Sequence, residues 1–174
     1  AGRTGTLFAY EQFGVKPDIL CCAKGIGGGI PIGAILTSSK IAECMQLGSH
    51  GSTFGGNPLA CAVAEQVMIM LSKKSLLNGV KKKEKLFLKE LKDINKEFKC
   101  FSAIRSSGLW IGCKLNVTEN FNLDTIMKAC YANGLMILKA NNNTIRIAPS
   151  LIIEDDLILK GLKILRQAIR EQLR

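Results

Sequence analysis

The first part of the chain consists of short apolar runs separated by glycine-rich segments. Ile19–Ala23 and Ile32–Thr37 have the length of strands and few polar residues, so the pattern predicts two buried strands. A short helix is expected after Lys40. Residues 48–58, GSHGSTFGGNP, contain too many glycines for regular structure.

An apolar helix is predicted to follow this segment. Asn57 can cap its first turn, and Pro58 suits its first position because proline has no N–H to leave unpaired there. The apolar pattern continues to about Leu71. Because the helix is apolar nearly all round, we expect it to be buried between layers.

From residue 73 onward the pattern becomes amphipathic. Residues 73–99 predict one long helix. Its core-facing positions are Val80, Phe87, Leu91, Ile94 and Phe98. A second helix is expected from Asn122 or Asp124 to Gly134. A third begins near Glu154, where three acidic residues suit a helix N-terminus. Its core-facing positions are Ile158, Leu162, Leu165 and Ile169.

Strands are predicted between these helices. Residues 109–115 alternate between apolar and other positions, which is typical of a half-buried strand. Its apolar side is made of Leu109, Ile111, Cys113 and Leu115. Residues 135–138 and 144–148 predict two more strands, joined through a polar NNN turn. The composition changes near Ser72, so we expect an α/β fold in two parts, residues 1–72 and residues 73–174.

The charge of +10 is concentrated in one segment. Residues 73–99 hold ten lysines against four acidic residues and therefore contribute +6. RNA binding is the alternative to a solvated helix face, but no aromatic residues interleave with the lysines to stack on bases. We expect a solvated face and no nucleic-acid partner.

The cysteines and the single histidine exclude several kinds of site. Seven cysteines, an odd number, with no signal-like segment indicate reduced thiols and a cytoplasmic protein. His50 alone supports neither a zinc site nor a protease that needs a histidine base. No apolar stretch reaches the ~20 residues that span a bilayer, so no membrane partner is expected.

Lys24 is the first candidate for chemistry. It ends an apolar run and is followed by five glycines within nine residues. Glycines let a bulky group approach the backbone closely. A partly desolvated lysine favours the free amine, which can condense with a carbonyl to form a Schiff base. The alternative is a structural lysine at a strand end. The glycines match neither nucleotide-loop pattern, G-x-x-x-x-G-K-[ST] or G-x-G-x-x-G.

Two further places are candidates for binding an anion. The segment GSTFGG offers the hydroxyls of Ser52 and Thr53 together with backbone amides, which suits a phosphate, although such segments also form ordinary turns. Arg146 lies in an apolar strand and therefore needs a carboxylate partner. That partner is either an acidic residue of the protein or a ligand.

Three segments in order resemble one family. They are PDILCCAKGIGGGIPIGA, GSHGSTFGGNPLACAVA and IRIAPSLIIEDD. They resemble the class III, fold-type I aminotransferases, which depend on pyridoxal phosphate. The opening AGRTGTLFAYEQFGVKPDI is also similar to the family segment that precedes the lysine. The resemblance implies that residues 1–72 end the large cofactor-binding domain and that residues 73–174 form the small C-terminal domain.

The resemblance also implies roles for the candidate residues. Lys24 would bind pyridoxal 5′-phosphate as a Schiff base and, once released, move a proton between the substrate carbon and the cofactor. Thr53, helped by Ser52, would reach the cofactor phosphate of a neighbouring subunit, which implies a homodimer with shared active sites. Arg146 would hold the α-carboxylate of 2-oxoglutarate or glutamate. No metal ion is expected.

Within the family, the chain is most similar to the branch that acts on acyl-ornithines, at Ala60-Cys61-Ala62 and at Ser150. The implied reaction moves an amino group from N2-acetylornithine to 2-oxoglutarate, as in arginine biosynthesis. The alternatives are an aminotransferase of succinylornithine, ornithine or 4-aminobutyrate, and a non-catalytic remnant that dimerises or binds RNA. Family chains are more than twice as long, so this chain is expected to be the C-terminal portion of such an enzyme.

Overall fold

The computed structural model describes residues 1–118, 121–141 and 143–173. The chain forms two compact units: Ala1–Gly2 with Thr6–Leu77, and Arg3–Gly5 with Asn78–Arg174. The expected assignment of residues 1–72 and 73–174 to a cofactor-binding domain and a small C-terminal domain stays a prediction.

The first unit contains a two-stranded antiparallel hairpin, β1 and β2, in which Ile19 pairs with Thr37 and Ala23 with Gly33. Its elements are η1 (Ala9–Phe13), β1 (Ile19–Ala23), η2 (Lys24–Gly27), β2 (Gly33–Thr37), α1 (Ser39–Ala42) and α2 (Pro58–Leu71). Both predicted strands are confirmed. The start of α2 is confirmed as well, because the Asn57 side chain accepts a hydrogen bond from the Ala60 N–H at 2.9 Å.

The expected burial of these elements is wrong for this chain. Ile35 and Leu36 of β2 are 58% and 49% exposed, and α2 fully buries only Ala60. In the described part of the first unit, α2 packs against η2, and no further helix or sheet covers the other faces of the hairpin or of α2. The apolar pattern correctly predicted strands and a helix, but the described residues leave much of their apolar surface exposed.

Gly28 is required where η2 meets α2. Its φ of +57° lies in the left-handed region, and a Cβ atom there would be 3.0 Å from Val67 Cγ2 and 3.2 Å from Val63 Cγ1. Both the backbone conformation and the close approach therefore favour glycine.

We expect Gly28→Ala to lower the free energy of unfolding by about 2 kcal/mol, because the new Cβ adds left-handed strain and a clash with α2. Urea unfolding followed by circular dichroism measures this. Gly25→Ala is the matched control, since no atom lies within 4 Å of its Cβ position. Equal losses for the two variants would show that the approach of η2 to α2 does not matter.

The second unit contains a four-stranded antiparallel sheet in the order β3-β4-β6-β5. Its elements are α3 (Lys74–Phe98), β3 (Phe101–Ser107), β4 (Trp110–Leu115), α4 (Leu123–Ala132), β5 (Leu138–Ala140), β6 (Thr144–Ile147) and α5 (Asp155–Gln172). The three predicted helices are confirmed. Strand β3 is missed by the sequence pattern, and β5 begins three residues later than expected.

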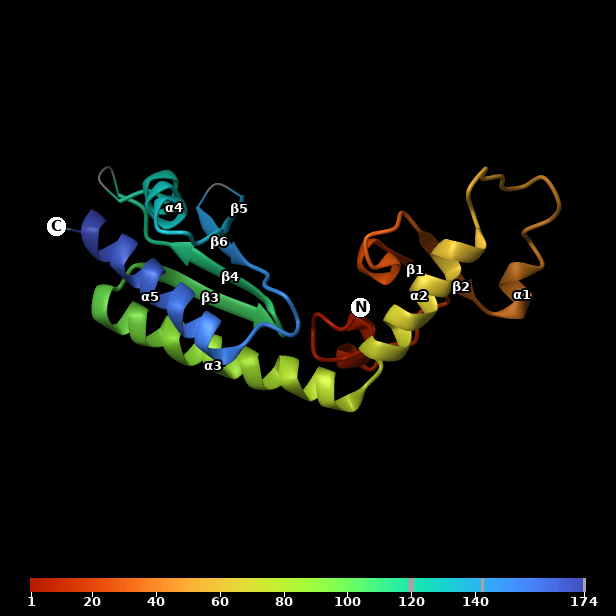
Figure 1. Ribbon diagram of the computed structural model, residues 1–174, viewed down its shortest axis with the longest axis horizontal. Helices are drawn as coiled ribbons and strands as arrows, with labels where there is room; N and C mark the ends of the chain where they lie inside the picture. Colours follow the sequence, from red (N-terminus) through yellow and green to blue (C-terminus); the bar gives the residue numbers. More distant parts are fainter. Residues whose placement is uncertain (119–120, 142, 174) are drawn as a thin grey trace. The chain divides into compact units, whose positions relative to one another are not determined.

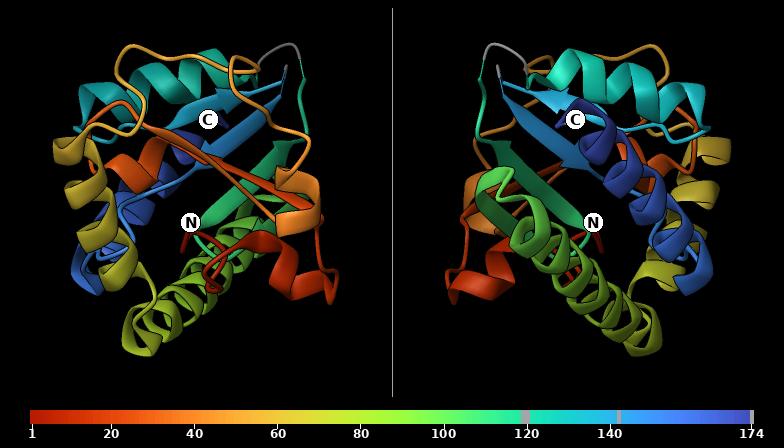
Figure 2. Two further views of the ribbon diagram at one scale, coloured as in Figure 1. Left: turned by 90° about the vertical axis from the view of Figure 1, so that its right-hand side faces the viewer. Right: turned by 90° about the vertical axis from the view of Figure 1, so that its left-hand side faces the viewer.

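Helices cover one face of this sheet. The Glu97 carboxylate of α3 lies 2.9 Å from the Arg170 guanidinium of α5, so these two helices lie side by side (Figures 1 and 2). Helix α4 packs on α5 and is tied to β5 by the Lys139–Asp124 pair at 2.9 Å. The predicted core is confirmed, except that Phe98 is only half-buried. The buried positions are Val80, Phe87, Leu91, Ile94, Leu109, Ile111, Cys113, Leu115, Ile158, Leu162, Leu165 and Ile169.

Residues Arg3–Gly5 complete the second unit from the start of the chain. The Leu109 N–H donates to the Arg3 carbonyl at 2.9 Å, and the Arg3 guanidinium donates to the carbonyls of Leu109 and Pro149. Gly108 has a φ of +61°, and a Cβ there would lie 2.3 Å from the Arg3 carbonyl oxygen. The segment Arg3–Gly5 therefore holds the turn before β4 and the chain after β6.

Candidate active site

Lys24 adopts a backbone conformation that is unusual for a residue with a side chain. Its φ is +57°, at the point where β1 ends and η2 begins. This left-handed conformation costs on the order of 1–2 kcal/mol for a non-glycine residue, and such strain is concentrated at functional sites. The strain favours the functional interpretation over an ordinary strand-end lysine.

The expected partial desolvation of Lys24 is not found in this chain. Its side chain is exposed, because the hairpin is covered on so few sides. Among the described residues, the Lys24 amine has no hydrogen bond or ion pair. An amine without a competing partner is available to react with a carbonyl.

The segment before α2 forms a folded turn. The Ser52 hydroxyl oxygen accepts a hydrogen bond from the Gly55 N–H at 2.9 Å, and the Asn57 amide donates to the Phe54 carbonyl at 2.8 Å. Thr53 is exposed, and its hydroxyl has no partner among the described residues. The hydroxyl protons of Ser52 and Thr53 remain available to an external anion.

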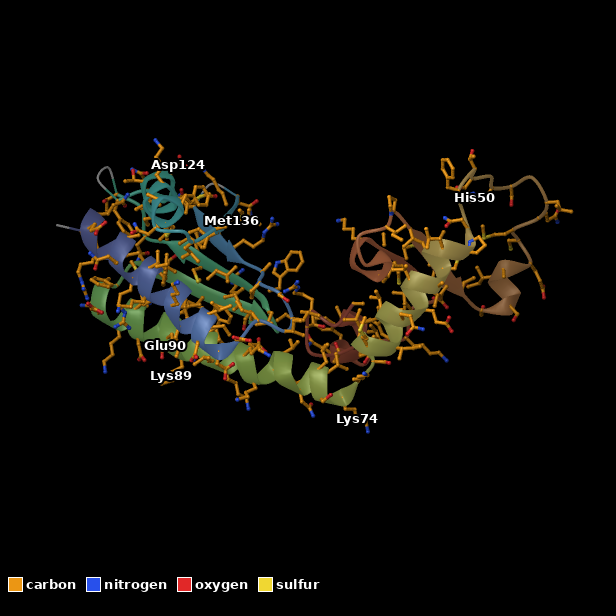
Figure 3. All side chains as sticks on the ribbon, viewed as in Figure 1. His50, Lys74, Lys89, Glu90, Asp124 and Met136 are labelled. Carbon is orange, nitrogen blue, oxygen red and sulfur yellow. The ribbon has the colours of Figure 1, made fainter. Side chains whose placement is uncertain are left out.

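A hollow of about 600 Å³ lies between the hairpin and this turn. Ser52 lines it together with His50, whose position on the loop before α2 is visible in Figure 3. Neither Lys24 nor Thr53 is among its lining residues. The structure thus brings Ser52 to the hairpin but does not gather Lys24, Ser52 and Thr53 around one cavity within the first unit.

Arg146 lies on the open face of the sheet in the second unit, opposite the face that the helices cover. Its neighbours Ile145 and Ile147 point toward the helices, and Ile145 is fully buried. The Arg146 Nε atom is buried without a hydrogen-bond partner, and its guanidinium has no carboxylate partner among the described residues. The internal ion pair that the sequence left open is therefore not found in the described chain.

A cavity of about 240 Å³ adjoins Arg146. Its other lining residues are uncharged. They include Leu138 and Met136, which Figure 3 labels, and also Phe87 of α3 and Leu162 and Leu165 of α5, so the cavity extends to the side of the sheet that the helices cover. Apolar walls lower the local dielectric constant and so strengthen the attraction between a guanidinium and a carboxylate. Arg146 is thus suited to bind the carboxylate of a ligand that also has an aliphatic part.

Trp110 is a neighbour of Arg146 that the sequence alone did not reveal. Its ring centroid lies 5.8 Å from Cζ of Arg146. The two residues are 36 positions apart, so only the pairing of β4 with β6 shows that they are neighbours. The sequence offered one indication: the alternation of β4 puts Trp110 on the face of the sheet opposite to that of buried Ile111.

The buried cysteines do not have the character of nucleophiles. Burial raises the pKa of Cys113 to about 12 and the pKa values of Cys100 and Cys130 to about 11. Their thiols therefore stay protonated near neutral pH. All seven cysteines lie in the described part of the chain and are unpaired.

The described residues contain no group of three or more histidine, cysteine or acidic side chains that could hold a metal ion. Within the same ranges, no helix has both the length and the apolar character needed to cross a bilayer.

Residues 1–169 match the model of the aminotransferase class-III family, and the chain belongs to that family. Class III aminotransferases depend on pyridoxal phosphate. Both the family resemblance and the α/β fold expected from the sequence are thereby confirmed.

Relatives named for two different substrates match the chain at the same sequence identity. The chain is 47% identical over 172 residues to the acetylornithine/succinyldiaminopimelate aminotransferase of Buchnera aphidicola, which is 99% of this chain and 42% of that protein. It is 47% identical over 170 residues to the succinylornithine transaminase of Yersinia pseudotuberculosis, which is 98% of this chain and 41% of that protein. The chain therefore spans less than half the length of these relatives.

The fold matches solved structures over a similar range. The N-acetylornithine aminotransferase of Stenotrophomonas maltophilia superposes with a TM-score of 0.84 at 38% identity, over 99% of this chain and 44% of that one. The exposed apolar faces of β2 and α2 lie in a chain that matches less than half of such a structure.

The residues of the first unit fit pyridoxal phosphate chemically. Lys24 offers an exposed amine, without a partner among the described residues, for the aldehyde of a cofactor, and the turn separately offers the Ser52 and Thr53 hydroxyls for a phosphate. These are the two kinds of group that the cofactor needs, a nucleophilic amine and hydrogen-bond donors for an anion.

Proposed function

We propose that this chain is part of an aminotransferase that moves an amino group from N2-acetylornithine to 2-oxoglutarate, giving N-acetylglutamate 5-semialdehyde and glutamate. The observation that supports it most is Lys24, a strained and exposed lysine without an ionic partner among the described residues, at the end of β1 in a chain that belongs to the class III family. The cytoplasmic location expected from the cysteines belongs to the same proposal.

Lys24 has two tasks in this reaction, binding the cofactor and moving a proton. When bound, pyridoxal phosphate supplies an electron sink for the carbon that loses or gains the amino group. Once free, Lys24 Nζ would accept the proton from the substrate carbon and pass it to the cofactor. An exposed amine without a competing ion pair can do both, because proton transfer requires direct access to the reacting atom.

Ser52 and Thr53 hold the phosphate in this proposal, and they do so for a neighbouring subunit. The exposure of Thr53, whose hydroxyl has no partner among the described residues, supports a hydroxyl that serves a partner's site. The enzyme would then be a homodimer with shared active sites.

Arg146 binds the α-carboxylate of 2-oxoglutarate or glutamate in this proposal. Its planar guanidinium can donate two parallel hydrogen bonds to a carboxylate. The buried Nε atom without a partner, and the apolar cavity next to it, support a ligand in place of an internal acid.

The acyl group is the finer part of the proposal. Relatives named for acetylornithine and for succinylornithine match the chain at the same 47% identity. The segment Ala60-Cys61-Ala62 and Ser150 favour an acyl-ornithine over free ornithine, and N2-acetylornithine is the acyl-ornithine proposed. A succinyl group is an acetyl group extended by a carboxymethyl group. A site for succinylornithine would therefore need an additional positively charged side chain to pair with the extra carboxylate.

The experiment is a comparison of amino donors. With the purified protein, pyridoxal phosphate and 2-oxoglutarate, we expect N2-acetylornithine to give the highest kcat/KM, ahead of N2-succinylornithine by roughly tenfold, with ornithine and 4-aminobutyrate lower still. Release of glutamate measures the rates. A preference for succinylornithine would change the substrate. Failure to bind the cofactor would favour the non-catalytic remnant.

A further inference from the structure

We propose that Trp110 is a positioning residue for Arg146, holding its guanidinium so that the outer N–H groups face a carboxylate ligand. This inference rests on the proposed role of Arg146. Trp110 does not need to touch the substrate to act in this way. The experiments below distinguish failure of this inference from failure of the proposed role of Arg146.

The sheet register brings the two side chains together. Arg146 of β6 pairs with Gly112 of β4 on one side and with Leu138 of β5 on the other. Directly paired residues share a face of the sheet, and residues two apart on one strand share it as well. Trp110 therefore lies diagonal to Arg146 on the open face, and Gly112 leaves space for the guanidinium because it has no side chain.

Trp110 orients Arg146 without taking up its hydrogen bonds. The indole centroid is 5.8 Å from Arg146 Cζ, within the range of a cation–π interaction. A carboxylate in that position would neutralise the guanidinium and occupy its N–H groups. A ring face attracts the cation but leaves its donors free, so the arginine keeps its capacity for a bidentate contact.

Arg3 holds the backbone near both Trp110 and Arg146. Trp110 follows Leu109, whose N–H donates to the Arg3 carbonyl at 2.9 Å and whose own carbonyl accepts from Arg3. The Arg3 guanidinium also donates to the carbonyl of Pro149, three residues after Arg146. One arginine thus fixes the backbone next to Trp110 and the backbone three residues after Arg146.

Trp110 itself is 54% exposed, so packing alone does not account for a large aromatic residue at this position. An exposed tryptophan contributes less to stability than a buried one. Its contact with Arg146 is the one ring interaction that the described residues give it.

Kinetics of variants provide the first test. In the holoenzyme we expect Trp110→Leu to raise the KM for 2-oxoglutarate about fivefold with kcat nearly unchanged. Trp110→Phe keeps an aromatic face and should recover most of this loss. Leu159→Ala is a matched control, because it removes an apolar side chain that is 42% exposed on α5 of the same unit. A rise in KM that Trp110→Phe does not reverse would overturn the inference.

Fluorescence provides a test that needs no variant of Trp110. Trp110 is the only tryptophan of the chain, so its emission reports on this one place. Titration with glutarate, an unreactive dicarboxylate, is expected to change the emission of the original protein but not that of Arg146→Gln. Sodium chloride at equal ionic strength serves as the blank. An emission that glutarate leaves unchanged would overturn the inference.

The outcomes separate the two claims. If Arg146→Gln weakens 2-oxoglutarate and Trp110→Leu does not, Arg146 keeps its role and the positioning by Trp110 is wrong. If neither change affects 2-oxoglutarate, the proposed role of Arg146 fails and this inference fails with it.

Discussion

Replacement of Lys24 by alanine is expected to lower turnover of acetylornithine by roughly 10⁴-fold, because the variant loses both the nucleophile and the group that moves the proton. Turnover with 2-oxoglutarate as acceptor measures the loss. A readout independent of turnover is reduction of the cofactor-loaded protein with borohydride followed by peptide mass spectrometry. It should put the mass of the reduced cofactor on the peptide that contains Lys24.

Lys40→Ala is the matched control for this experiment. Lys40 is an exposed lysine of the same unit, in α1, and like Lys24 it has no partner among the described residues. We expect Lys40→Ala to keep turnover and cofactor binding. Normal turnover in Lys24→Ala, or cofactor mass on another lysine peptide, would remove Lys24 from the reaction and return it to the role of a strand-end residue.

Replacement of Arg146 by glutamine is expected to raise the KM for 2-oxoglutarate roughly 100-fold. The variant loses a charge-assisted bidentate contact in apolar surroundings, where such contacts are strong. Cofactor absorbance should stay unchanged, because Arg146 is proposed to bind the substrate and not the cofactor. Arg146→Lys keeps the charge without the planar fork and should recover only part of the loss.

Arg105→Gln is the matched control for Arg146. Arg105 pairs with Gly112 from the other side, in β3, so it lies on the same face of the sheet as Arg146. It is exposed and has no ionic partner among the described residues. If both glutamine variants raised the KM equally, the effect would come from the general positive charge of the sheet face and not from a specific contact.

The sequence was most informative where the residues that form an element also bury it. The apolar face of α3 and the apolar side of β4 pack against elements of the same unit. The pattern therefore predicted both the elements and the core. For β2 and α2 the pattern predicted the elements but not their exposure, because burial depends on what else packs against them. Strand β3 has too few apolar residues, FSAIRSS, to stand out before β4 pairs with it.

The candidate site was predicted to a different extent in each unit. Lys24 was found because a lysine between an apolar run and five glycines is an unusual local pattern, and its positive φ agrees with that interpretation. For Arg146 the local pattern favoured an internal acid over a ligand, since a counter-ion can come from any strand. Trp110 could not be linked to Arg146 without the register of β4 and β6.

The pairing of Arg3 with residues near positions 109 and 149 has a consequence for the order in which the chain folds during synthesis. Arg3 leaves the ribosome long before its partners, which lie 106 and 146 positions later. At the usual rates of translation, that interval is on the order of 10 seconds. The second unit therefore cannot reach its final form by local folding of α3 and the strands alone. The segment Arg3–Gly5 must stay unpaired until the turn at Gly108 is made, and a factor that captured this segment early would delay that step.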